Sequence, residues 1–192
     1  MKPHFFAVSL TVCAISALLP NQAFAANLTL YAAGSLTNAL TEVSKDFTQE
    51  TGIGVSTVFG PSGIREQAIE TELQQGQPTA DVFASADIGN PQKLYNQGLS
   101  TQPVEFTQNK IVAVFSSKYS QTKITSEQLL NYLLDPNVKL GTSTPIADPL
   151  GDYTQKIFEL ANSSQPGSFD ILNNKALRLV GEELAKLSPS AN

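Results

Sequence analysis

After its first 25 residues the chain alternates short β-rich runs with helical patterns, and this alternation limits the possible folds more than any other feature. A strand, a helix and a second strand normally place the two strands parallel, with the helix covering one face of the sheet. Strands are predicted at residues 28–33, 53–59 and 80–86, the last well buried, each followed by a helix. We therefore predict an α/β fold with mainly parallel sheets.

Capping residues and glycines mark the helix boundaries. Ser35 and Ser62 each precede apolar residues at helical spacing, so both are predicted as N-caps, as is Asn90 before Pro91. Glycines just past the predicted helix ends favour termination there. They are Gly52, Gly76 and Gly98.

The second half continues the pattern less regularly. A strand is predicted at residues 110–115, followed by a helix that starts with a capping box formed by Thr125 and Gln128. A short strand at residues 138–141 precedes a helix opened by Asp148 and Pro149. The last helical pattern covers residues 169–187 and is interrupted by glycine and asparagine.

Residues 1–25 have the three parts of a secretory signal peptide. Lys2 gives the basic start, residues 5–19 form the apolar run, and Ala-Phe-Ala at residues 23–25 is a small-x-small cleavage site. A membrane anchor needs about 20 apolar residues, and this run is shorter. We expect a cleaved signal, a periplasmic location, a first lobe at residues 26–105 and a second lobe at residues 106–192.

Cleavage would remove Met1, His4 and Cys13, which are the only methionine, histidine and cysteine. The exported chain would then have no disulfide, no thiol nucleophile and no imidazole base or metal ligand. With Lys2 also removed, 11 basic residues face 17 acidic ones, a formal charge of −6. An acidic chain without a basic tract is a poor nucleic-acid binder. We expect no enzyme, no cofactor and no nucleic-acid partner.

Three predicted strand-to-helix junctions, at residues 33–35, 60–63 and 147–151, are rich in Gly, Ser and Pro. The first N–H groups of a helix have no intrahelical acceptor and carry partial positive charge, so helix starts bind anions. A serine hydroxyl adds a donor, and glycine permits close approach. The alternative is that Ser35 and Ser62 are structural N-caps only, and spacing leaves both readings open.

Four blocks, in order, resemble the periplasmic molybdate-binding proteins of ABC importers. They are Leu30-Tyr31-Ala32-Ala33-Gly34-Ser35-Leu36, Phe59-Gly60-Pro61-Ser62-Gly63, Ala80-Asp81-Val82-Phe83-Ala84-Ser85-Ala86-Asp87, and Gly141-Thr142-Ser143-Thr144-Pro145 with Asp148-Pro149-Leu150-Gly151-Asp152-Tyr153. The similarity runs from about residue 28 to residue 179. Each block alone is a weak signal, and their common order makes the resemblance specific.

The resemblance implies a monomeric, two-lobed periplasmic binding protein that captures molybdate or tungstate and passes it to a membrane permease. In that family the serines of the first two blocks donate hydroxyl and amide hydrogen bonds to the anion, which corresponds to Ser35 and Ser62. A backbone N–H before the glycine of the Pro-x-Gly turn corresponds to Leu150. Side chains are not expected to coordinate the metal directly.

Family members continue past the point equivalent to Leu187 and supply a further amide and a Tyr hydroxyl. We therefore expect a C-terminally truncated copy with an incomplete second lobe. Ser85 and Asp87 are assigned to a turn. Asp148 is assigned to the N-cap of its helix, because a carboxylate facing a dianion would repel it. Direct contact of Asp148 with the metal centre, as in some archaeal relatives, is the minor alternative.

Other functions compete with this interpretation. Ser62 lies in a turn like that of a serine hydrolase, but such a serine needs a base and no histidine follows residue 25. Ser120 and Lys123 fit Ser-x-x-Lys without its companion motifs. A binding protein for sulfate or another oxyanion, or a truncated non-functional copy, remains the alternative.

Overall fold

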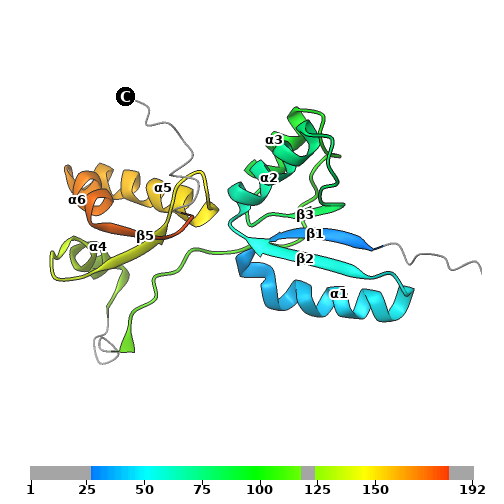
Figure 1. The fold of residues 1–192 in the computed structure, drawn as a ribbon. Coiled ribbons are helices and arrows are strands. Elements are labelled where there is room, and N and C mark those ends of the chain that lie inside the picture. The colour runs from blue at the N-terminus through cyan, green and yellow to red at the C-terminus, as the bar shows by residue number, and fades with distance from the viewer. Residues whose placement is uncertain (1–26, 118–123, 182–192) are drawn as a thin grey trace, which may run out of the picture.

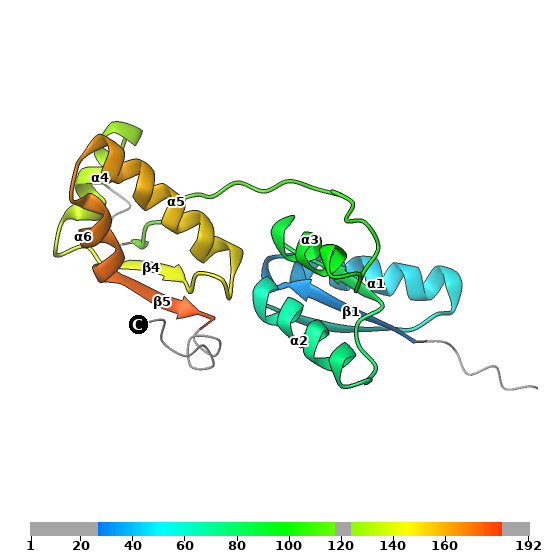
Figure 2. The same ribbon diagram turned by 90° about the horizontal axis from the view of Figure 1, so that it is seen from above.

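The computed structural model describes residues 27–117 and 124–181. Its elements form two groups, joined by residues 101–116, which adopt neither helix nor strand (Figures 1 and 2). All strand pairs among the described residues are parallel, which confirms the predicted fold class. The predicted lobe boundary at residues 105 and 106 falls within the joining segment and stays a prediction.

The first group is a three-stranded parallel sheet between helices, with the strand order β2-β1-β3. Its strands are β1 Leu28–Ala33, β2 Val55–Gly60 and β3 Val82–Ala84. One face is covered by α1, and the other by α2 and α3 (Figure 1). These helices are α1 Thr37–Thr51, α2 Ser62–Gln74 and α3 Gly89–Asn96, and the short 3₁₀ helix η1 Gly34–Leu36 joins β1 to α1.

The core of this group forms where inward-facing residues of β1 and β3 meet. Leu30, Ala32 and Ala84 are buried there, and Leu40 and Phe59 pack against them. Val82 is 50% exposed because β3 is an edge strand, so the prediction of a well-buried third strand is wrong at this position. Gly52 ends α1 with φ 72, as its sequence position predicted.

The second group pairs two parallel strands with three helices (Figure 2). They are α4 Ser126–Leu134, β4 Leu140–Ser143, α5 Pro149–Ser164, α6 Ser168–Lys175 and β5 Ala176–Val180. The buried Phe158 of α5 meets the ring of Phe169 edge to face, at a centroid distance of 6.4 Å. The capping box of Thr125 and Gln128 is confirmed.

Two predicted elements are wrong. Residues 110–115 are not a strand, and Val112 and Val114 are 71% and 88% exposed. An apolar, β-branched run forms a strand only where a neighbouring strand accepts its hydrogen bonds. Residues 176–180 form β5 instead of continuing a helix, because they pair with β4.

The predicted signal peptide and the end of the last predicted helix lie outside the described residues. Within the described residues, every helix is too short or too polar to cross a bilayer.

Candidate functional site

The first two strand-to-helix junctions lie side by side because their strands are paired. Ala33, the last residue of β1, is opposite Gly60, the last residue of β2, in a parallel register. The turn η1 and the helix α2 therefore start at the same edge of the sheet. Ligands of open parallel sheets typically bind at this carboxyl edge.

Ser35 is exposed and lies inside η1. The prediction that it is an N-cap is wrong, because the 3₁₀ turn shifts the start of α1 to Thr37 and makes Leu36 the N-cap residue. The N-cap residues of η1 and α1 are Ala33 and Leu36, so the Ser35 hydroxyl caps neither helix.

Ser62 is fully buried and is the first residue of α2, with Pro61 in the N-cap position, so its predicted N-cap role is also wrong. Its Oγ accepts a hydrogen bond of 3.1 Å from the backbone N–H of Ala86, just beyond β3. A hydroxyl has one hydrogen to donate as well as lone pairs. The contact with Ala86 therefore leaves that hydrogen available.

The third junction starts α5, and Asp148 caps it as predicted. One carboxylate oxygen, Oδ1, accepts from the Leu150 N–H at 3.0 Å and from the Ser143 hydroxyl at 2.8 Å. Pro149 occupies the first turn of α5, where a missing N–H costs no hydrogen bond. The Leu150 amide is thus paired with Asp148 in this structure, and its assignment as a ligand donor stays a prediction.

One backbone contact brings the third junction to the first two. The Gly63 N–H in the first turn of α2 donates to the Ala147 carbonyl oxygen at 3.0 Å. The loop before α5 accordingly approaches the start of α2 in both views (Figures 1 and 2). The junctions carrying Ser35, Ser62 and Leu150 therefore occupy one region between the two groups.

Ser85 and Asp87 form a local turn, in agreement with their assignment. The Ser85 hydroxyl donates to Asp87 Oδ1 at 2.7 Å, and the Asn90 side-chain amide donates to the same oxygen at 2.8 Å. The turn orders the backbone next to Ala86. Ser62 and this turn are thus linked through the Ala86 N–H.

Arg65 is a charged residue near these junctions that the sequence analysis did not single out. Its guanidinium lies 5.7 Å from the ring centroid of Tyr31, and its Nε lies beside Gly60 at the end of β2. The only sequence signal is its helical spacing from Ser62. A hydrogen bond to Glu72 raises the pKa of Tyr31, although the charge of Arg65 opposes that shift.

A second charged cluster lies between α2 and α3, on the side chains of Glu66, Glu70 and Lys93. Lys93 Nζ lies 2.9 Å from the buried carboxylate of Glu66 and 3.3 Å from Glu70 Oε1. Burial raises the pKa of Glu66, although the hydrogen bond from Lys93 opposes that shift. The cluster ties the two helices together.

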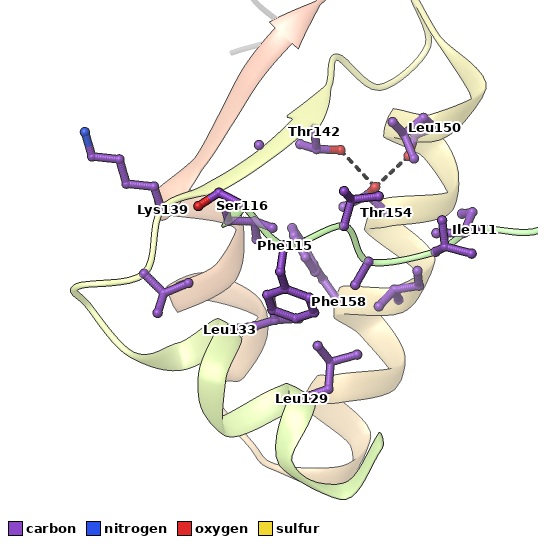
Figure 3. A pocket seen from close by; sticks show the side chains of 17 residues that line it. Ile111, Phe115, Ser116, Leu129, Leu133, Lys139, Thr142, Leu150, Thr154 and Phe158 are labelled. Atoms are coloured by element: carbon purple, nitrogen blue, oxygen red, sulfur yellow. Dashed lines mark hydrogen bonds between the residues drawn. The ribbon is translucent and has the colours of Figure 1, made fainter. Parts of the chain in front are cut away.

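A cavity of about 620 Å³ opens between the segment at residues 111–116 and α4, α5 and β4, and Leu150 of the third junction is among its lining residues (Figure 3). Phe115, Leu133 and Phe158 point toward one another there. Thr154 bridges Thr142 and the Leu150 carbonyl at one edge. An apolar lining of this kind suits packing rather than recognition of a small polar solute.

Residues 27–117 and 124–181 contain no group of three His, Cys, Asp or Glu side chains that could hold a metal ion. The pair Ser120 and Lys123 lies outside the described residues.

Comparison with known proteins gives a matching family and several relatives. A model for the family of bacterial extracellular solute-binding proteins matches residues 28–187. An uncharacterized protein of Pasteurella multocida (strain Pm70) is 35% identical over 152 residues, covering 79% of this chain and 60% of the relative. The molybdate-binding protein ModA of Azotobacter vinelandii is 33% identical over 103 residues, covering 53% of this chain and 39% of the relative.

Among solved structures, the periplasmic binding protein P5PA is similar in fold. It has a TM-score of 0.53 and 15% identity, and the match covers 84% of this chain and 60% of that one. The chain therefore spans less than two thirds of the length of these relatives.

Proposed function

Since the chain belongs to the family of bacterial extracellular solute-binding proteins, we propose that it captures molybdate or tungstate in the periplasm and delivers the anion to the membrane permease of an ABC importer. In this proposal Ser35 and Ser62 donate hydroxyl and amide hydrogen bonds to the anion, and the Leu150 amide closes the site. The chain acts as a monomer, reaches the periplasm through a cleaved signal, and catalyses no reaction.

The observation that carries the proposal is the meeting of three helix starts in one region. The Ala33 and Gly60 register aligns the first two, and the hydrogen bond from Gly63 to Ala147 brings the third. Helix starts present N–H groups and partial positive charge. A dehydrated dianion can be held by such groups without an ion pair.

The donor chemistry favours a fully ionised anion. Molybdate offers only acceptor oxygens, and the Ser35 and Ser62 hydroxyls can both donate. Phosphate at neutral pH still carries a proton, so a phosphate site gains from a hydrogen-bond acceptor for that proton. Arg65, one helical turn from Ser62, adds positive potential without contacting the ligand in this proposal.

Asp148 sets a condition on binding. Its Oδ1 accepts the Leu150 N–H in this structure, so an anion oxygen must replace that carboxylate oxygen if Leu150 is to become a ligand donor. Repulsion between the dianion and Asp148 favours such an exchange. The same oxygen also accepts the Ser143 hydroxyl, so the exchange breaks that hydrogen bond or leaves it to the other carboxylate oxygen.

The name of the Azotobacter relative supports molybdate. Sulfate binding is the alternative, because sulfate is also tetrahedral and fully ionised at neutral pH. The two differ in size, so a competition experiment separates them.

The test is a thermal-shift titration with molybdate, tungstate, sulfate and phosphate. A ligand that binds only the native state stabilises it by about 2.7 kcal/mol at a hundred times its Kd. We expect molybdate and tungstate to raise the Tm at micromolar concentration and phosphate to leave it unchanged. Ser56→Ala, an exposed serine on β2, is the matched control for Ser35→Ala. A flat response to all four anions would refute the proposed function.

A further inference from the structure

The loop at residues 144–147 fits closely against three glycines, two in separate helices and one just beyond β5. A Cβ at Gly63 of α2 would collide with the Ile146 carbonyl oxygen, and one at Gly181 would lie 2.8 Å from the Ala147 Cβ. One at Gly151 of α5 would collide with the backbone of Thr144. Each site tolerates the loop only because glycine has no side chain.

Gly63 differs from the other two because it belongs to the first group of elements, whereas the loop belongs to the second. The three heavy atoms nearest to a Cβ at this position all come from Ile146 and Ala147. Its N–H donates to the Ala147 carbonyl oxygen at 3.0 Å, and Ala147 is almost completely buried. A donor that helix geometry leaves without an acceptor is thus satisfied across the two groups.

The backbone of the loop is held in a strained conformation. Ile146 has φ 70, which is unfavourable for a β-branched residue. Its side chain is 75% exposed, so packing does not compensate for the strain. The Ile146 N–H donates to Asp152 Oδ1 at 2.8 Å, and the Thr144 N–H donates to the Val180 carbonyl at 2.8 Å. Strain of this kind persists where surrounding contacts fix the backbone.

We propose that Gly63 is a positioning residue. By leaving room for the loop at residues 144–147, it keeps the start of α5 beside the start of α2 and so holds the two groups in contact. The link to oxyanion capture rests on the proposed function, whereas the contact between Gly63 and the loop does not depend on it.

The test measures the distance between the groups without ligand. Spin labels are attached to Asp46→Cys on α1 and Ser163→Cys on α5, both exposed, in the full chain with Cys13→Ser. We expect Gly63→Ala to shift the distance distribution to longer values. Gln67→Ala, an exposed position on the same helix, is the matched control and should leave the distribution unchanged. An unchanged distribution in folded Gly63→Ala would overturn the proposal.

Hydrogen exchange tests the unsubstituted chain and does not depend on the folding of any variant. The Gly63 amide should be protected from exchange because Ala147 accepts its hydrogen bond. Exchange at the rate of an exposed amide would overturn the proposal.

Molybdate separates this inference from the proposed function. If molybdate leaves the unsubstituted chain unchanged while Gly63→Ala still lengthens the distance, the proposed ligand is wrong and the positioning role of Gly63 stands. If molybdate narrows the distance distribution of the unsubstituted chain and has a weaker effect on that of Gly63→Ala, the proposed ligand and the positioning role of Gly63 are both supported.

Discussion

Alanine substitutions of Ser62 and Ser35 should have different effects on folding but similar effects on binding. Ser62 is fully buried, and its Oγ accepts the Ala86 N–H at 3.1 Å. Ser62→Ala leaves that N–H without its acceptor, which costs about 1–3 kcal/mol. In a domain of this size, each kcal/mol corresponds to roughly 2–4 °C in Tm. Ser35 is exposed, so Ser35→Ala should change the stability by less than about 0.5 kcal/mol.

Both hydroxyls donate to the anion in the proposed site, and a hydrogen bond to a charged group contributes about 1.5–3 kcal/mol. Each substitution should therefore weaken molybdate binding roughly ten- to hundredfold, since 1.4 kcal/mol is a factor of ten. Urea denaturation without ligand and calorimetric titration with molybdate measure the two effects separately. Equal stability of the two variants would refute the role of Ser62 in holding Ala86, and unchanged affinity in both would refute the site.

Three further substitutions test separate parts of the structure. Ile146→Gly removes the positive-φ strain of about 1–2 kcal/mol but adds about 0.5–1 kcal/mol of backbone entropy cost, so urea midpoints should show a net stabilisation below about 1.5 kcal/mol; a clear loss of stability would contradict the strain. Asp148→Ala removes the α5 cap and should cost about 0.5–2 kcal/mol in the same assay, and no loss would contradict capping. Burial raises the pKa of Glu66, so the folded state binds its proton more tightly than the unfolded state, and this contribution to stability is lost as pH rises above about 4.3. The free energy of unfolding of the wild-type chain minus that of Glu66→Gln should therefore fall between pH 4 and the raised pKa of Glu66. An increase of this difference over that pH range would contradict the predicted sign.

Local sequence signals predicted the elements whose boundaries depend on nearby residues. The Thr125 capping box and the Asp148 cap each join residues two or three positions apart, so their patterns are visible in the sequence. Gly52 ends α1 for a similarly local reason, since its φ of 72 suits glycine.

Tertiary pairing decided the elements that were predicted wrongly. Residues 110–115 have strand composition but pair with no strand in the described part of the chain, and residues 176–180 become a strand because β4 lies beside them. Neither outcome can be derived from periodicity, because each depends on a distant segment.

The resemblance predicted Ser35, Ser62 and Leu150 as ligand residues, and that assignment stays a prediction. The pairing of Leu150 with Asp148 and of Ser62 with Ala86 is visible only in the structure. The bond between Gly63 and Ala147 joins residues 84 positions apart in the sequence. Sequence spacing alone cannot predict a contact of that kind.

In the proposed site, Ser35 and Ser62 hold a tetrahedral oxyanion between the helix starts. The most direct measurement is anomalous X-ray scattering from tungsten in crystals of the chain grown with tungstate. We expect one tungsten peak within hydrogen-bond reach of both serine hydroxyls, near the first turn of α2. A peak elsewhere, or none in crystals that diffract well, would contradict it.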